Sequence, residues 1–135
     1  QPLFWVKDSQ VNYLPNKRFA VNYEPFLFIY KPPIRDLTGA SMSTFHFNKG
    51  SDVTKEHPAQ KPEALYASLI ELSSIKGETV LDPMAGSGMA LVAAKRMGRN
   101  VIGIELNEEW YNLIKINLSK VNGDGKSTKI RKEEV

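Results

Sequence analysis

Cysteine is absent from this chain of 135 residues, and only two histidines, His46 and His57, are present. Without thiols the chain can form neither a disulfide scaffold nor a thiolate metal site, and two histidines are too few for a structural zinc site. The absence of cysteine is also compatible with a reducing compartment, so we expect a cytoplasmic protein.

Long apolar runs are absent as well. No run approaches the roughly 18 apolar residues that a membrane span needs, and the N-terminal residues lack the basic and apolar segments of a secretory signal. We therefore expect no membrane partner. Hydrophobic residues still make up 41% of the chain, enough for the core of one domain. Because the first residue is Gln1 and not methionine, we expect the chain to begin partway through a longer gene product.

The charge pattern gives little indication of a partner. The net charge is +3, and most of the excess positive charge follows Ser119. A solvated tail explains such a cluster as well as nucleic-acid binding does. Charge alone therefore does not separate a nucleic-acid-binding protein from other classes.

Aromatic and β-branched residues dominate the first part of the chain. Short runs at 3–6, 19–23 and 26–30 predict strands, and the last run is nearly all apolar, which is typical of a strand covered on both faces. Residues 35–60 are polar and have neither a helical nor a strand period, so we expect a long loop there.

Residues 61–121 alternate between helical and strand patterns. Apolar runs at 79–81 and 101–104 predict two short buried strands, and helical patterns flank each of them. Successive strands joined through helices form a parallel sheet, so we predict an α/β fold of the Rossmann-like type with flanking helices. After Val121 the chain is polar, and we expect residues 122–135 to form a flexible tail.

The segment LDPMAGSGMA, residues 81–90, places an acid, a proline and two glycines between the first of these strands and a helix. A strand that passes through such a loop into a helix brings several backbone N–H groups together, and Gly86 and Gly88 lack the Cβ atoms that would keep a ligand away. Glu105 ends the next strand, where an acid accepts hydrogen bonds from ribose hydroxyls in doubly wound sheets. The loop and the acid together predict an adenosine-type ligand at the strand ends.

Two residues, Leu91 and Asp82, indicate that the adenosine-type ligand is not a dinucleotide. The dinucleotide fingerprint needs a third small residue in the helix, where this chain has Leu91, so the close helix–strand approach is not encoded in that manner. Asp82 stands where a pyrophosphate would be repelled and an ammonium group attracted. S-adenosyl-L-methionine carries an ammonium, a sulfonium, an adenine and a ribose diol, and we predict it as the cofactor. The alternative is a plain βα turn, in which the glycines serve only the geometry of the turn.

Residues 57–111 resemble the DNA amino-methyltransferases, which make N6-methyladenine or N4-methylcytosine. In that family an HPxxKP stretch precedes LDPFxGSGT, and RxxIGIE follows. Here the same order reads HPAQKP at 57–62, LDPMAGSGM at 81–89 and RNVIGIE at 99–105. The resemblance implies a site-specific DNA methyltransferase of the kind found in restriction-modification systems, with double-stranded DNA as its substrate.

The resemblance also implies a set of cofactor-binding residues. His57 and Lys61 would clamp the carboxylate of the cofactor, although a merely solvated lysine is the alternative for Lys61. Met84 stands where the family usually has phenylalanine, which changes the packing against adenine, and Met89 replaces a threonine and so removes a hydroxyl group. The full set is His57, Lys61, Asp82, Pro83, Met84, Gly86, Ser87, Gly88, Glu105 and Leu106.

The motif order resembles that of the circularly permuted members of the family, in which a catalytic tetrapeptide precedes the cofactor loop. That tetrapeptide is an acidic or polar residue followed by two prolines and an aromatic, and the nearest strings, KPPI at 31–34 and YEPF at 23–26, do not fit it. The catalytic residues are therefore expected upstream of Gln1. Residues 1–121 would be the C-terminal, incomplete part of a methyltransferase domain, with 61–121 as its cofactor-binding half.

Three functions remain open from the sequence. The first is a DNA amino-methyltransferase that works with a missing N-terminal part, as a homodimer or with a restriction-system partner. The second is a non-catalytic module that binds the cofactor or DNA. The third, a nicotinamide oxidoreductase, is disfavoured by Leu91 and Asp82. The basic residues Arg35, Lys49 and Lys55 of the expected loop have no spacing typical of DNA recognition.

Overall fold

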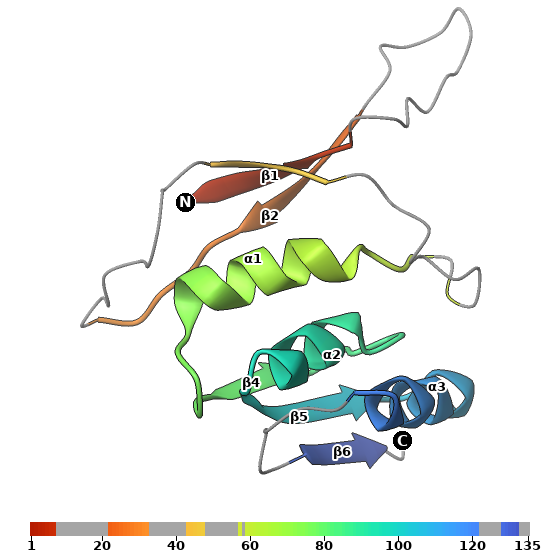
Figure 1. Ribbon diagram of the computed structural model, residues 1–135. Coiled ribbons are helices and arrows are strands. Elements are labelled where there is room, and N and C mark those ends of the chain that lie inside the picture. Colours follow the sequence, from red (N-terminus) through yellow and green to blue (C-terminus); the bar gives the residue numbers. More distant parts are fainter. Residues whose placement is uncertain (8–21, 33–42, 48–56, 58, 122–127, 133–135) are drawn as a thin grey trace, which may run out of the picture.

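Two three-stranded sheets and three helices make up the described part of the chain (Figure 1). The computed structural model describes residues 1–7, 22–32, 43–47, 57, 59–121 and 128–132. The strands are β1 (Pro2–Val6), β2 (Tyr23–Leu27), β3 (Thr44–His46), β4 (Thr79–Asp82), β5 (Asn100–Glu105) and β6 (Thr128–Lys132). The helices are α1 (Glu63–Ser73), α2 (Met89–Arg96) and α3 (Glu108–Ser119).

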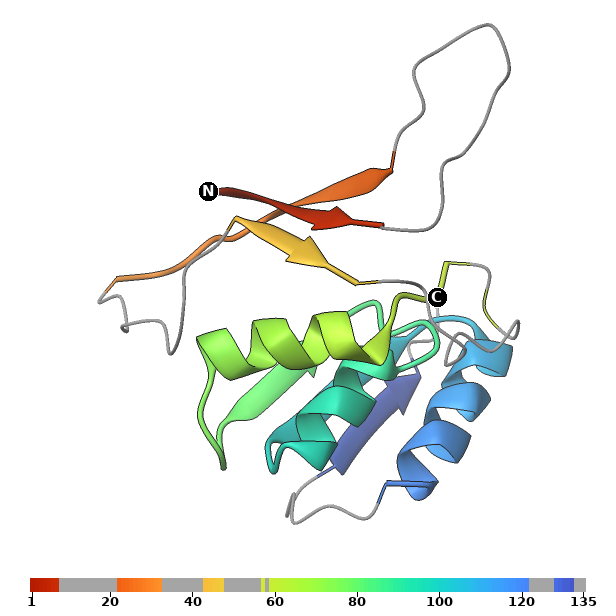
Figure 2. The same ribbon diagram turned by 45° about the horizontal axis from the view of Figure 1, so that its top comes forward.

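The C-terminal sheet has the strand order β4-β5-β6, and each neighbouring pair is parallel. Helix α2 connects β4 to β5, and α3 follows β5 and packs beside α2 (Figure 2). The α/β fold with a parallel sheet and flanking helices, predicted from the alternating pattern of residues 61–121, is therefore confirmed. Because α2 contacts α1, α3 and the sheet, five consecutive residues from Ala90 to Ala94 are buried in it.

A glycine on the strand allows helix α2 to approach β5 closely. A Cβ atom at Gly103 of β5 would lie 2.4 Å from Cδ1 of Leu91, a distance too short for any real contact. Leu91 is fully buried. The bulky side chain therefore belongs to the helix, and the residue without a side chain, Gly103, belongs to the strand. The helix and strand approach closely without the third small residue of the dinucleotide fingerprint, because the small residue comes from the strand.

Asn107 caps the N-terminus of helix α3. The side chain of Asn107 accepts a hydrogen bond from the backbone N of Trp110 at 3.1 Å, and Glu108 and Glu109 occupy the first turn, where negative charge is favourable. Ile114 and Leu118 are buried against α2 and the sheet. The start of α3 is thereby held directly after the end of β5.

The N-terminal sheet has the strand order β2-β1-β3, with β2 antiparallel and β3 parallel to β1. In both views α1 lies between the two sheets (Figures 1 and 2). Trp5 of β1 is only 1% exposed, and its Nε1 donates to the carbonyl oxygen of Phe47 at 2.8 Å. Helix α1 thus joins a small aromatic core under β1 to the main core around α2.

Two segments expected to lack regular structure contain strands. Within 35–60, Thr44–His46 forms β3, since the peptide groups of β1 offer a partner that no local pattern reveals. Within the expected tail, Thr128–Lys132 forms β6 along β5, with Ile130 packed against the core. Lys132 also pairs with Glu108 of α3 at 3.2 Å. At these strands the expectations were wrong because long-range pairing overrode the local polar composition, and residues 35–42, 48–56, 58, 122–127 and 133–135 of the two segments lie outside the described residues.

Two strands are more exposed than expected, the run 26–30, expected to be covered on both faces, and the run 79–81, expected to be buried. The apolar run 26–30 contributes only its first residues to β2, and Leu27 and Ile29 are 70% and 82% exposed. In β4, Leu81 is 56% exposed, while Val80 on the other face packs against the core. Both strands lie at the edges of their sheets. Of the run 19–23, residues 19–21 lie outside the described residues, and Tyr23 begins β2.

None of the helices in the described ranges combines the length and the apolar character that crossing a lipid bilayer would require.

Candidate functional site

Three hydrogen bonds from its N–H groups hold the loop between β4 and α2 in place. Met84 N donates to Oδ1 of Asp82 at 3.2 Å, Ala85 N donates to the carbonyl of Ile104 at 3.0 Å, and Gly88 N donates to the carbonyl of Ala85 at 2.7 Å. Gly88 begins α2 in the left-handed region, with φ 77°. These bonds fix the shape of the loop and occupy the N–H groups of Met84, Ala85 and Gly88.

Glu105 fixes the loop relative to the next strand. Its Oε2 accepts a hydrogen bond from Gly86 N at 2.7 Å, and its Oε1 accepts one from Asn107 N at 2.9 Å. Each carboxylate oxygen has a second lone pair, so Glu105 can still accept from a hydroxyl group of a ligand. The acid therefore has a fixed orientation at the end of β5 and keeps part of its accepting capacity.

Asp82 is the second acid at the strand ends. Burial raises the pKa of its carboxyl group, the hydrogen bond from Met84 N lowers it in part, and the negative charge of Glu105 raises it further. Asp82 and Glu105 thus stand close enough to affect each other. Two carboxylates that disfavour each other's charge make a place where a cationic group is stabilised.

His57 lies against the glycine loop. A Cβ atom at Gly86, whose φ is 53°, would be 3.1 Å from Nε2 of His57, so the absence of a side chain lets the imidazole approach. The ring of His57 meets that of Trp110 edge to face, with centroids 4.5 Å apart, and its Nδ1 accepts from Ala59 N at 3.2 Å. The histidine, the loop and the start of α3 therefore belong to one site.

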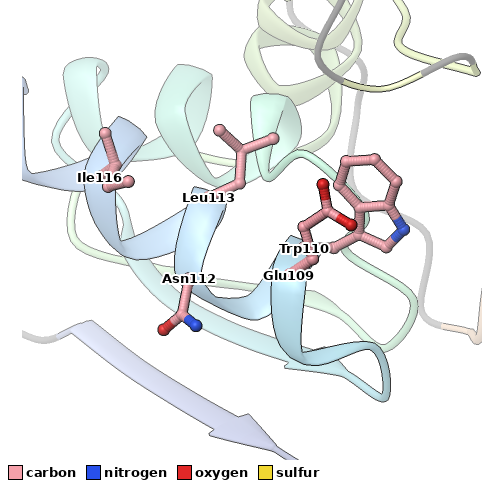
Figure 3. A pocket seen from close by; sticks show the side chains of 5 residues that line it. All are labelled: Glu109, Trp110, Asn112, Leu113 and Ile116. Atoms are coloured by element: carbon pink, nitrogen blue, oxygen red, sulfur yellow. The ribbon is translucent and has the colours of Figure 1, made fainter.

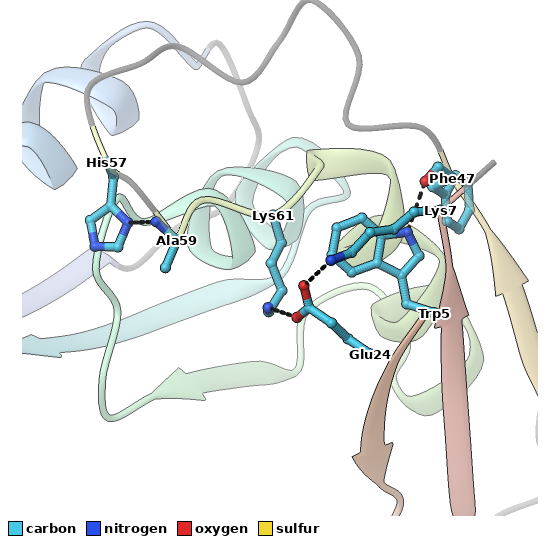
Figure 4. A network of polar contacts seen from close by, with 7 residues as sticks. All are labelled: Trp5, Lys7, Glu24, Phe47, His57, Ala59 and Lys61. Carbon is cyan, nitrogen blue, oxygen red and sulfur yellow. Dashed lines mark hydrogen bonds and ion pairs between the residues drawn. The ribbon is translucent and has the colours of Figure 1, made fainter. Parts of the chain in front are cut away.

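Lys61 points away from His57 and toward the N-terminal sheet (Figure 4). Its Nζ forms an ion pair with Glu24 of β2 and lies 5.6 Å from the centroid of the Trp5 ring. Lys7 pairs with the other oxygen of Glu24 at 2.6 Å. Burial raises the pKa of Glu24, but the hydrogen bonds and charges of Lys61 and Lys7 outweigh it and lower the pKa.

Tyr66 connects this cluster with Asp82. Its pKa is raised to about 12, first by burial and then by the negative charges of Asp82 and Glu24. A cavity of about 290 Å³ lies beside it, between α1 and the N-terminal sheet. Its lining is Trp5, Glu24, Pro25, Phe26, Lys61, Leu65, Tyr66 and Leu69. No pattern in the sequence indicates Glu24, Lys7 or Tyr66, because their proximity depends on how β2 packs against α1.

The remaining predicted residues divide by exposure. Ser87 is buried, and its carbonyl oxygen accepts from Nδ2 of Asn117 at 3.0 Å, which ties the loop to α3. Pro83 is exposed, and Met84 and Leu106 are 85% and 57% exposed. Exposed apolar side chains beside two acids suit a ligand with both an apolar face and polar groups.

A second cavity, of about 380 Å³, extends along α3 (Figure 3). Its lining residues are Glu109, Trp110, Asn112, Leu113 and Ile116, so it shares Trp110 with the loop site. The sequence did not predict it. The basic residues Arg35, Lys49 and Lys55, which the sequence analysis weighed for DNA contacts, lie outside the described residues.

Comparisons with known proteins agree with one another. The family model for N6/N4 DNA methylases matches residues 1–116. The type II methyltransferase M.HpaI of Haemophilus parainfluenzae is 38% identical over 99 residues, which cover 70% of this chain and 32% of that protein. The type II methyltransferase M2.DpnII of Streptococcus pneumoniae is 42% identical over 67 residues, covering 50% of this chain and 25% of that protein.

Among solved structures, the crystal structure of the M1.HpyAVI–SAM complex superposes with a TM-score of 0.72 at 27% identity. The superposition covers 87% of this chain and 61% of M1.HpyAVI. The chain therefore spans about a third or less of the length of the two curated relatives and 61% of the solved one.

Proposed function

Because the chain belongs to the family of N6/N4 DNA methylases, we propose that it supplies the cofactor-binding half of a DNA amino-methyltransferase. The enzyme would transfer a methyl group to the exocyclic amine of adenine or cytosine in double-stranded DNA. The cofactor would be S-adenosyl-L-methionine, which is present in the M1.HpyAVI complex. The observation that carries the proposal is the pair of carboxylates, Asp82 and Glu105, at the ends of two neighbouring parallel strands.

The residues at the strand ends fit the parts of this cofactor. Asp82 would accept from the ammonium group, since a cation lowers the cost of keeping this buried carboxylate ionised. Glu105, held by Gly86 and Asn107, would accept from the ribose hydroxyls. Met84 and Leu106 would cover the adenine. The carboxylate of Asp82 at the strand end would repel a pyrophosphate, which disfavours a nicotinamide dinucleotide.

The cofactor carboxylate would lie toward Lys61, as the sequence predicted, and the ion pair with Glu24 permits this. Glu24 has two basic partners, so it keeps Lys7 when Lys61 shares its charge with a ligand. The side chain of Lys61 is 37% exposed and that of Lys7 is 14% exposed, which makes Lys61 the accessible member of the pair.

When bound, the cofactor supplies an electrophilic methyl group on its sulfonium. The residues of this chain bind and orient that group, while the target base must be turned out of the duplex and held at its amine. The acidic or polar residue, two prolines and aromatic that perform the latter step in the family are not found in this sequence. The chain alone is therefore expected to bind the cofactor and to methylate DNA poorly or not at all.

Calorimetric titration of the chain with S-adenosylhomocysteine and with NAD tests the cofactor assignment. We expect a heat signal with S-adenosylhomocysteine and none with NAD. The reverse result would remove the proposal in favour of an oxidoreductase. Methylation of DNA by the chain alone would contradict the proposed division between the two halves of the enzyme.

A further inference from the structure

Three charged side chains from three separate parts of the chain meet around one buried aromatic ring (Figure 4). Lys7 follows β1, Glu24 lies in β2, and Lys61 precedes α1. The Nζ atom of Lys7 is 2.6 Å from Oε1 of Glu24, and the Nζ atom of Lys61 donates to Oε2 of the same carboxylate. Each carboxylate oxygen therefore has its own ammonium group, and a single acid joins the two lysines.

The N-terminal sheet holds Glu24 in place. Glu24 stands opposite Trp5 in the antiparallel pairing of β1 and β2, and the buried ring of Trp5 is fixed by its hydrogen bond to the carbonyl of Phe47. The Nζ atoms of Lys7 and Lys61 lie 5.0 and 5.6 Å from the centroid of this ring, within the range of a cation–π interaction. An unpaired lysine side chain has many rotamers of similar energy. Glu24 and the ring therefore give Lys61 its direction.

The direction of Lys61 leads to the cavity between α1 and the N-terminal sheet. Glu24, Lys61 and Tyr66 all line this cavity of about 290 Å³. Burial raises the pKa of Tyr66, and the negative charges of Asp82 and Glu24 raise it further. Tyr66 is therefore within electrostatic range of both acids, and a ligand that reaches from Asp82 to Lys61 passes beside it.

The two lysines that share Glu24 are not equivalent. The side chain of Lys7 is 14% exposed and that of Lys61 is 37% exposed, so the loss of a counter-charge would cost Lys7 more. A lysine ammonium has three donors, and Glu24 accepts from one of those on Lys61. Lys61 can thus bind a second carboxylate without leaving the first, while Lys7 keeps its own bond to Glu24.

We propose that Glu24 is a positioning residue that directs Lys61 toward the anionic end of the ligand, and that Lys7 compensates the charge of Glu24 while Lys61 binds two carboxylates. This inference rests on the proposed function for the identity of that anionic end, the carboxylate of the amino acid moiety of S-adenosyl-L-methionine. Charge alone predicts the opposite effect. An acid repels an anionic group, so its removal would tighten binding if Glu24 only added negative charge.

Titration calorimetry of Glu24→Gln tests this sign. The dissociation constant for S-adenosylhomocysteine should rise about fivefold or more, because Lys61 loses its direction, whereas that for methylthioadenosine, which lacks the amino acid end, should stay the same. Glu24→Asp keeps the charge on a shorter side chain and should recover part of the affinity. The matched control is Glu63→Gln, which removes an acid of the first turn of α1 that pairs with Arg96 at 3.4 Å. It should bind both ligands like the wild type.

Two further measurements separate positioning from a structural role. In a Lys61→Met background, Glu24→Gln should have no additional effect on S-adenosylhomocysteine binding, because the acid acts only through the lysine. Labelling of lysines with acetic anhydride, followed by mass spectrometry, should modify Lys61 faster in Glu24→Gln than in the wild type, because the ammonium group is no longer held. Lys7→Met should also weaken S-adenosylhomocysteine binding, since Lys61 would then be the only cation on Glu24.

Other outcomes overturn the inference. They are unchanged or tighter binding of S-adenosylhomocysteine by Glu24→Gln, an equal loss of both ligands, an equal effect of Glu24→Gln with and without Lys61, and unchanged labelling of Lys61. If the wild type binds S-adenosylhomocysteine, any of these removes only the positioning role of Glu24. If the wild type itself does not bind S-adenosylhomocysteine, the proposed function is removed together with the inference.

Discussion

Replacing Asp82 by asparagine should stabilise the fold and weaken cofactor binding at the same time. Burial raises the pKa of this carboxyl group, so the folded chain disfavours its ionised form. Asparagine is neutral, has nearly the same shape and keeps an oxygen that can accept from Met84 N. The variant should therefore lose the ammonium partner without losing the geometry of the loop.

The magnitude of the binding loss follows from the bond that is removed. A hydrogen bond to a charged group contributes about 1.5–3 kcal/mol, so the dissociation constant for S-adenosylhomocysteine should rise by roughly tenfold to more than a hundredfold. Titration calorimetry measures this. Glu71→Gln, which changes an exposed acid on α1, is the matched control and should bind as tightly as the wild type.

The stability gain should depend on pH with a defined sign. Below the ordinary carboxyl pKa of 3.8, Asp82 is protonated in both the folded and the unfolded chain, and the variant has little advantage. As the pH rises above that value, the unfolded chain ionises first, so the wild type loses stability until the pH passes the raised pKa of the folded state. Urea unfolding at several pH values should show the gap between variant and wild type widening and then levelling off.

Glu105→Gln provides the contrast that could refute this reasoning. Both oxygens of Glu105 accept backbone N–H groups, so a glutamine turns one NH2 group toward a donor and should lower both stability and affinity. If Asp82→Asn lowered stability as well, or left the affinity unchanged, the electrostatic account of the strand ends would be wrong.

Three further outcomes test other parts of the structure. Gly103→Ala should lower the free energy of unfolding by about 1–3 kcal/mol in urea titrations, because the new Cβ overlaps Leu91, and the penalty should shrink in a Leu91→Val background. Lys61→Met should weaken S-adenosylhomocysteine binding by roughly tenfold while leaving methylthioadenosine, which lacks the carboxylate, unaffected in calorimetry. Ile130→Asp should cost about 1–3 kcal/mol in the same unfolding assay if β6 packs on the core, whereas a flexible tail would tolerate it.

The sequence predicted the C-terminal half of the fold because its signals there are local. The cap at Asn107, the glycines before α2 and the apolar runs of β4 and β5 each act within a few residues. Strand β3 and strand β6 were missed for the opposite reason. Strand β3 has few residues and β6 is mostly polar, so no local pattern marks either as a strand. Only pairing with a distant strand makes their backbones extended.

The candidate site likewise combines features that local signals predict with features that depend on long-range packing. The positions of Asp82 and Glu105 at the ends of neighbouring strands follow from chain order and from parallel pairing, and both could be predicted. The ion pair of Lys61 with Glu24 could not, because the two residues are 37 positions apart in the sequence and lie on elements whose packing no motif describes. The exposure of Leu81 was also missed, since an apolar strand in sequence does not reveal which of its faces is covered.

The charges around Tyr66 give the site a polarity that a zwitterion fits. At one end stand the carboxylates of Asp82 and Glu105, and at the other Lys61 and Lys7 share the single carboxylate of Glu24, which leaves that cluster one positive charge in excess. The phenol of Tyr66, with its pKa near 12, stays neutral between them at physiological pH. A ligand with two phosphates would meet repulsion at the acidic end. An amino acid moiety, with its ammonium toward Asp82 and its carboxylate toward Lys61, is attracted at both ends, and this polarity favours the methyl donor over a dinucleotide.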